Sequence, residues 1–127
     1  AEISRTTEII RQITGQPVRY YSPFYGEYTP KVVAAAAELG YRVVRWSIDT
    51  IDWKLPGVGW MLDRVATRLH PGAIILMHPT AQSPAALKGI LQLLQTRGLQ
   101  LVPLSELLDP TWEPDLGPLL ARWPGPR

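Results

Sequence analysis

Apolar residues follow two spacings along the chain. Short uninterrupted apolar runs are typical of strands buried on both faces, whereas apolar residues recurring every three or four positions are typical of amphipathic helices. The expected strands cover residues 18–21, 41–47, 73–77 and 99–102, of which 73–77 is an uninterrupted apolar run. The expected helices cover residues 1–14, 31–39, 58–70 and 85–97, with a short helical turn at 105–108.

Local signals support these boundaries. Thr29-Pro30 and Ser83-Pro84 each place a capping hydroxyl before a proline, which is a typical helix start. Within the third and fourth helices, the spacing predicts two buried stripes. The predicted stripe residues are Trp60, Met61, Val65 and Leu69, followed by Leu87, Ile90, Leu91 and Leu94.

The alternation of helices and strands predicts an α/β fold with a parallel sheet and about four strands. Such an arrangement is either half of an eight-fold (β/α) barrel or a small open sheet, and the alternation alone does not choose between them. In both cases the carboxyl ends of the strands lie at one edge of the sheet. We therefore expect Ser22, Asp49 and His78, which follow three successive strands, to lie on the same face.

Length and composition limit the kinds of protein that this sequence can encode. A length of 127 residues suits one domain, which we place at 1–108, and the Pro-rich residues 109–127 read as a tail. The net charge of +2 and the scattered arginines do not favour nucleic-acid binding. No apolar run is long enough to span a membrane. The sequence starts inside a predicted helix, which suggests a fragment.

Asp49 and His78 form the sharpest chemical pair, because a carboxylate facing an imidazole fixes its tautomer and favours the protonated ring. That arrangement suits a general acid. The alternative is a structural histidine satisfied by any nearby acceptor. We assign Asp52 a loop-capping role. With two histidines and no cysteine, the sequence offers no cluster of metal ligands.

Three short motifs resemble those of the polysaccharide deacetylases, the NodB-homology domain of carbohydrate esterase family four. The stretch from Ser22 to Thr29 stands in place of the family's third motif, Arg-Pro-Pro-Tyr-Gly-x-Tyr-Asn. Residues Asp49 to Trp53 match the fourth motif, Asp-x-x-Asp-Trp, and Leu76 to His78 match the fifth, Leu-x-His. The resemblance covers about 1–108, the C-terminal half of the domain.

The resemblance implies a distorted (β/α) barrel that removes acetyl groups from N-acetylglucosamine units of peptidoglycan or a chitin-like polymer. It implies that His78 is the general acid, that Asp49 tunes it, and that the backbone N–H of Tyr25 stabilises the oxyanion. Trp53 and Leu76 would line the acetyl pocket. Ser22 and Pro23, which belong to the third motif, would also contact the substrate.

The same resemblance implies a divalent metal, usually zinc, in the parent enzyme. The family's first two motifs, which supply the catalytic base and the metal ligands, have no counterpart here, so we expect the chain alone to bind no metal. We expect it to pair with the upstream half of the domain or with a second copy, in a bacterial cell envelope or after secretion.

Ser22 replaces the arginine of the family's third motif, and Thr29 replaces its asparagine. A non-catalytic carbohydrate-binding or assembly module is therefore the alternative hypothesis.

Overall fold

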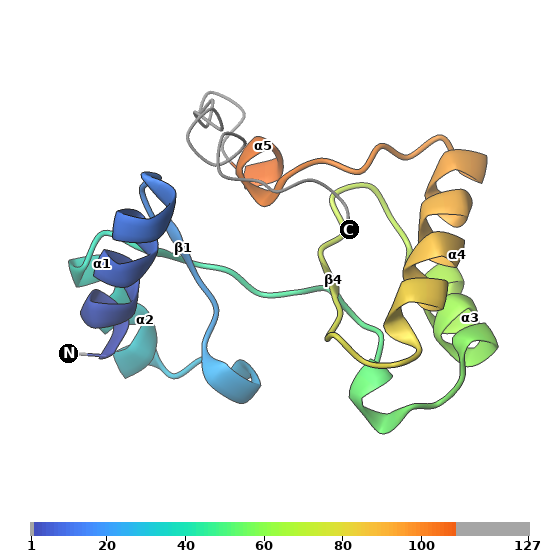
Figure 1. Ribbon diagram of the computed structural model, residues 1–127, viewed down its shortest axis with the longest axis horizontal. Helices are drawn as coiled ribbons and strands as arrows, with labels where there is room; N and C mark the ends of the chain where they lie inside the picture. The colour runs from blue at the N-terminus through green and yellow to red at the C-terminus, as the bar shows by residue number, and fades with distance from the viewer. Residues whose placement is uncertain (1, 109–127) are drawn as a thin grey trace. The chain divides into compact units, whose positions relative to one another are not determined.

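The computed structural model describes residues 2–108, and the predicted tail at 109–127 lies outside this range (Figure 1). Helices and short strands alternate along the chain, as predicted. The helices are α1 (Glu2–Thr14), α2 (Pro30–Glu38), α3 (Val58–Arg68), α4 (Ser83–Thr96) and α5 (Leu104–Leu108). The strands are β1 (Tyr20–Tyr21), β2 (Arg42–Val43), β3 (Ile48–Asp49) and β4 (Ile75–Leu76). Two 3-10 turns are η1 (Phe24–Gly26) and η2 (Asp52–Lys54).

The described residues form two compact units, and each is treated by itself below. The first unit comprises 2–45 and the second 46–108. In each unit, two strands pair in parallel, which confirms the predicted α/β class and strand direction. The single sheet expected from the sequence is replaced by two separate two-stranded sheets.

The first unit places β1 beside β2, with Tyr20 opposite Arg42 and Tyr21 opposite Val43. Helix α2 begins as its sequence predicts, because the Val32 N–H donates to the side-chain oxygen of Thr29 at 3.2 Å. Burial in this unit is limited. Helix α1 leaves three apolar side chains substantially exposed: Ile9, Ile10 and Ile13.

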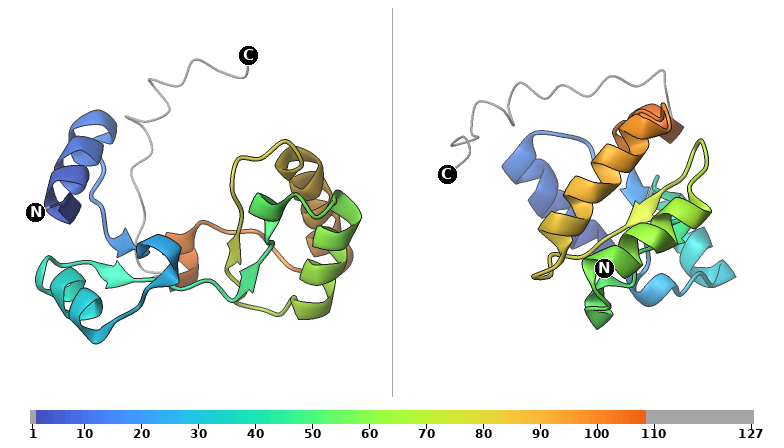
Figure 2. Two further views of the ribbon diagram at one scale, coloured as in Figure 1. Left: turned by 90° about the horizontal axis from the view of Figure 1, so that it is seen from below. Right: turned by 90° about the vertical axis from the view of Figure 1, so that its right-hand side faces the viewer.

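The second unit contains β3, β4 and the packed pair of helices α3 and α4, which lie side by side (Figure 2). Its core is formed by Ile48, Val65, Ile90 and Leu94. Gly89 allows α4 to approach α3 closely, since a Cβ at this position would lie 2.6 Å from the side chain of Leu62. This core supports the ends of β3 and β4, where the candidate chemistry lies.

Two predicted strands differ from the structure. The expected strand at 41–47 divides into β2 and β3, which belong to different sheets. The first pairing ends where the Val44 N–H donates to the Tyr21 carbonyl, and the second begins where the Ser47 N–H donates to the Ile74 carbonyl. Residues 99–102 form no strand, because the Leu99 N–H turns back to the Leu94 carbonyl and closes the end of α4.

The buried stripes were predicted only in part. Met61, Val65, Ile90 and Leu94 are buried, as expected. Trp60, Leu87 and Leu91 are each more than 40% exposed, so their assignment to the core was wrong. Each lies at the margin of its helical stripe, and the Arg64 guanidinium covers the Trp60 ring at 5.5 Å.

Candidate functional site

The end of strand β3 is held by the backbone and carboxylate of Asp49. The Asp49 Oδ1 atom accepts a hydrogen bond from the Ile51 N–H at 2.8 Å, and Arg64 Nε donates to the Asp49 carbonyl at 2.7 Å. Ile51 has a positive φ of 55°, which a β-branched residue rarely adopts. The Asp49 carboxylate therefore stabilises a strained turn that directs the next residue, Asp52, into the interior.

Asp52 is fully buried, and three donors from the segment after β4 converge on its carboxylate. Its Oδ2 atom accepts from the His78 backbone N–H at 2.5 Å and from the Ser83 hydroxyl at 3.2 Å. Its Oδ1 atom lies 2.8 Å from Nδ1 of the His78 ring. The His78 side chain is 45% exposed, whereas that of Asp52 is 0% exposed. The pair thus joins a buried anion to a ring that reaches the surface.

The predicted pairing of His78 with Asp49 was wrong, because the carboxylate that contacts the ring is that of Asp52. The loop-capping role that we assigned to Asp52 belongs instead to Asp49, which binds the Ile51 N–H. Asp49 ends strand β3 and Asp52 follows three residues later, so spacing alone could not separate their roles. The turn at Ile51 decides between them.

The environment of Asp52 favours its anionic form. Burial alone raises the pKa of this carboxyl, but the hydrogen bonds from the His78 backbone, the His78 ring and the Ser83 hydroxyl together lower the pKa below its ordinary value. An anionic Asp52 accepts the proton on Nδ1 of His78. The second ring nitrogen, Nε2, then remains as the atom that can exchange a proton with a ligand.

The other predicted residues of the second unit lie close to this pair in the chain. Trp53 is adjacent to Asp52 and is 57% exposed, and the Lys54 ammonium lies 4.9 Å from the centre of its ring. Leu76 is half-buried at the end of β4, and its carbonyl accepts from the Thr50 hydroxyl at 2.9 Å. An exposed indole directly after Asp52 in the chain is suited to contact a ligand.

The first unit carries the residues predicted from the third motif. Pro23 is buried, whereas Ser22 is exposed and its hydroxyl lies 3.2 Å from that of Tyr28. Tyr28 donates in turn to the Val44 carbonyl at 2.8 Å, which anchors the turn to the end of β2. Tyr25 has a positive φ of 53° and a side chain that is 96% exposed. Its proposed backbone contact with an oxyanion stays a prediction.

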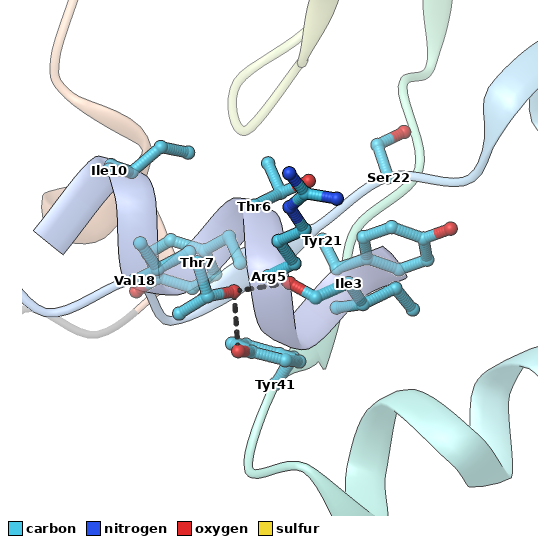
Figure 3. Close-up of a pocket in the computed structure, with 10 residues that line it drawn as sticks. Ile3, Arg5, Thr6, Thr7, Ile10, Val18, Tyr21, Ser22 and Tyr41 are labelled. Carbon is cyan, nitrogen blue, oxygen red and sulfur yellow. Dashed lines mark hydrogen bonds between the residues drawn. The ribbon is translucent and has the colours of Figure 1, made fainter. Parts of the chain in front are cut away.

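A cavity of about 490 Å³ lies between α1 and β1 in the first unit, and Ser22 is at its margin (Figure 3). Its wall includes Thr7, which accepts a hydrogen bond from the Tyr41 hydroxyl at 2.5 Å and donates to the Ile3 carbonyl at 2.9 Å. Arg5 contributes a positive charge to the wall. The Thr7–Tyr41 contact ties α1 to the chain just before β2.

Comparison with known proteins identifies relatives of one kind. A family model described as polysaccharide deacetylase matches residues 1–44. The chain is 34% identical over 110 residues to "Uncharacterized protein YlxY" of Bacillus subtilis, a match that covers 87% of the chain and 34% of that protein. It is 31% identical over 117 residues to a peptidoglycan-N-acetylglucosamine deacetylase of Bacillus cereus, covering 88% of the chain and 42% of that protein.

Solved structures give the same result. A CE4 family pseudoenzyme from Bacillus anthracis superimposes with a TM-score of 0.78 at 38% identity, covering 84% of this chain and 38% of that one. A peptidoglycan N-acetylglucosamine deacetylase superimposes with a TM-score of 0.78 at 32% identity, covering 83% of this chain and 51% of that one. The chain belongs to the polysaccharide deacetylase family. Its fold is accordingly part of a (β/α) barrel, as predicted.

As a polysaccharide deacetylase family member, the chain spans about a third to a half of the length of these relatives. Among residues 2–108, no three His, Cys, Asp or Glu side chains converge on a point where they could hold a metal ion. The described residues therefore do not fit the metal implied by the family. Within the same range, no helix is both long and apolar enough to cross a bilayer.

Sequence reasoning missed two residues of the site. Asp52 was present in the family motif but received the wrong role, and its position directly before Trp53 was the available signal. Ser83 was recognised only as part of a helix start. Its contact with Asp52 joins residues 31 positions apart, and no local pattern indicates such a contact.

Proposed function

We propose that this chain carries the acid side of a deacetylase active site, which acts on N-acetylglucosamine units of a bacterial polysaccharide such as peptidoglycan. The observation that carries this proposal is the bond between buried Asp52 and the exposed ring of His78 at the ends of β3 and β4. Relatives named as peptidoglycan and chitooligosaccharide deacetylases support the substrate class.

In this proposal His78 delivers the proton that the leaving amine needs. After water has added to the acetyl carbon, the C–N bond of the acetamido group breaks, acetate is released, and the nitrogen takes the proton from Nε2 of the imidazolium. Nδ1 keeps its own proton and donates it in a hydrogen bond to Asp52 Oδ1, which lies 2.8 Å away. The buried anion stabilises the positive ring before the transfer. Asp52 therefore takes the tuning role that the sequence assigned to Asp49.

Other predicted residues, in both units, would bind the substrate. Trp53, exposed beside the pair, would line the acetyl pocket with Leu76. The backbone N–H of Tyr25 would stabilise the oxyanion, with Ser22 and Pro23 at the substrate-binding loop. Trp53→Phe should remove most of the fluorescence change that glucosamine oligomers produce, and an undiminished change would exclude Trp53 as the contact.

The proposal assigns no step to a metal on this chain, because its described residues do not fit one. The family's first two motifs, which bring the base and the zinc ligands, are missing from the 127 residues. We infer that the chain depends for activity on the upstream half of the domain, supplied by the same polypeptide or by a partner chain. The same proposal places the protein in the cell envelope or outside the cell, where peptidoglycan lies.

A second candidate function is a non-catalytic carbohydrate-binding or assembly module. Two observations favour it. One solved relative, at 38% identity, is described as a CE4 family pseudoenzyme, and one of its mutants is described as having restored enzymatic activity. In addition, Ser22 occupies the position of the arginine in the family's third motif.

One experiment separates these functions. Acetate release from N-acetylglucosamine polymers and bound zinc are measured for the 127-residue chain and for a polypeptide extended upstream through the first two motifs. We expect neither zinc nor activity in the short chain, and both in the extended one. Stoichiometric zinc in the short chain would show that it holds ligands of its own. A zinc-loaded, folded, extended polypeptide that stays inactive on several polymers would favour the non-catalytic module.

A further inference from the structure

Ser83, the first residue of α4, makes an unusual number of contacts for one buried hydroxyl. Its Oγ atom accepts from the Thr80 N–H at 3.1 Å and lies 2.8 Å from the Thr80 hydroxyl. It also contacts the His78 carbonyl and lies 3.2 Å from Asp52 Oδ2. One side chain thus contacts both residues that bracket the turn after β4 and the carboxylate that binds the His78 ring.

The donor count limits how these contacts operate. A serine hydroxyl has one proton and accepts at two positions. The Thr80 N–H, and the Thr80 hydroxyl when it donates, occupy the accepting positions. The single proton is then divided between the His78 carbonyl and Asp52 Oδ2. Both acceptors belong to the acid pair, so the hydroxyl holds the backbone of His78 and the carboxylate of Asp52 in a fixed relation.

We propose that Ser83 is a positioning residue for the Asp52–His78 pair, an inference that rests on the proposed general-acid role of His78. By binding Oδ2, it turns the Asp52 carboxylate so that Oδ1 faces Nδ1 of the ring. This orientation keeps the proton on Nδ1 and leaves Nε2 as the exchanging atom. The start of α4 adds to the effect, because a helix N-terminus stabilises a nearby anion.

No other ionisable group competes for this position among the described residues around it. The Asp49 carboxylate, on the same loop as Asp52, is bound to the Ile51 N–H. The Lys54 ammonium lies over the Trp53 ring. His78, after β4, is the ionisable partner of Asp52, and α4 presents Ser83. A substitution of Ser83 should therefore change the tautomer of His78 and the titration of Asp52 directly.

The test compares Ser83→Ala and Ser83→Cys with a control, Ser105→Ala. Ser105 is also a buried serine of the second unit, but it lies on α5 rather than at the start of α4. In the 127-residue chain, long-range ¹⁵N–¹H spectra report the tautomer of His78, and ¹³C spectra report the titration of Asp52. We expect a single Nδ1–H tautomer in the wild type and in Ser105→Ala.

In Ser83→Ala, we expect a measurable share of the Nε2–H tautomer and a rise in the pKa of Asp52, because one of its donors is lost. Ser83→Cys, whose thiol donates weakly and fills the same site, should change both in the same direction to a smaller extent. If Ser83→Ala fails to fold, the same two spectra of Ser83→Cys provide the test. A tautomer and a carboxyl titration unchanged in both folded variants would overturn the proposal.

A second arm uses the extended polypeptide. Ser83→Ala should lower kcat roughly tenfold, as expected for the loss of one charge-assisted hydrogen bond, and leave KM almost unchanged. A raised KM with unchanged kcat would contradict a positioning role. If the extended wild type is inactive while the spectra change as expected, the proposed deacetylase function fails and the positioning role of Ser83 stands. Unchanged spectra reject the positioning role whatever the activity.

Discussion

The two units stabilise similar turns with different interactions. In each, a parallel strand pair ends in a turn that contains a non-glycine residue with positive φ: Tyr25 in the first unit and Ile51 in the second. The second unit supports its turn with buried Asp52 and a core around Val65. The first unit anchors its turn through the Tyr28 hydroxyl at the end of β2 and leaves apolar side chains of α1 exposed.

The predicted site residues fall into two groups, one in each unit. The acid pair is assembled from residues of the second unit alone, so its geometry is determined by local packing and hydrogen bonds. The third-motif turn lies in the first unit, where the Tyr25 side chain and three apolar side chains of α1 are exposed. We therefore expect substitutions in the second unit to have large and specific effects, and equivalent substitutions in the first unit to have small ones.

The largest effect is expected from Asp52→Asn. The change removes a buried anion and replaces one of two accepting oxygens with an NH₂ group that cannot accept from the donor facing it, so it should destabilise the chain by about 3 kcal/mol. Asp49→Asn is the matched control, because the asparagine oxygen can still accept from the Ile51 N–H. Urea unfolding measures both variants. Equal losses would contradict the distinct roles given to the two carboxylates.

The identity of these carboxylates also shows how far the sequence could predict the site. The spacing of apolar residues identified the helices. The alternation of helices with strands predicted that the strands are parallel and that Asp49 and His78 lie at strand ends. They could not identify Asp52 as the partner of His78, because that choice depends on the positive φ of Ile51. Likewise, residues 41–47 contain no glycine or proline that would mark the end of a strand, and only the pairing of β2 and β3 with different strands divides them.

One apolar substitution in each unit tests their unequal packing. Val65→Ala removes two methyl groups from a fully buried position and should cost about 2 kcal/mol. Ile13→Ala shortens a side chain that is 61% exposed on α1, and should change stability by less than about 0.5 kcal/mol. Both are measured by urea unfolding followed by circular dichroism. A loss at Ile13 as large as that at Val65 would show that α1 is packed more tightly than its exposure indicates.

Two helical glycines sharpen the description of the second unit. Gly89→Ala should destabilise the chain by about 1 kcal/mol, because the new Cβ would lie 2.6 Å from Leu62 and force that side chain to move. Gly59→Ala, on α3, meets no atom within 4 Å and should stabilise by about 0.5 kcal/mol through helix propensity. Thermal unfolding of both variants gives the comparison. The same sign for both changes would mean that the α3–α4 contact does not limit residue size at Gly89.

The smallest expected effect compares two carboxyls whose pKa values are lowered for different reasons. In the first unit, the pKa of Glu8 is lowered by a hydrogen bond from Arg11 on an exposed helix face. In the second, burial opposes ionisation of Asp52, but bonds from His78 and Ser83 outweigh it and lower the pKa. Each lowered pKa contributes stability that is complete above the ordinary carboxyl pKa, about 4, and is lost as the pH falls through the folded-state value.

Salt should separate the two groups, because ions screen exposed charges more than buried ones. In ¹³C titrations, raising the salt concentration should return the pKa of Glu8 toward its ordinary value and leave that of Asp52 almost unchanged. Gln12, which also donates to Glu8 at 2.9 Å, is neutral, so its contribution to the lowered pKa should persist in salt and limit the change. An equal response of both carboxyls would show that water and ions reach Asp52 as freely as Glu8. That result would remove the distinction between a buried, preorganised acid pair and an exposed ion pair.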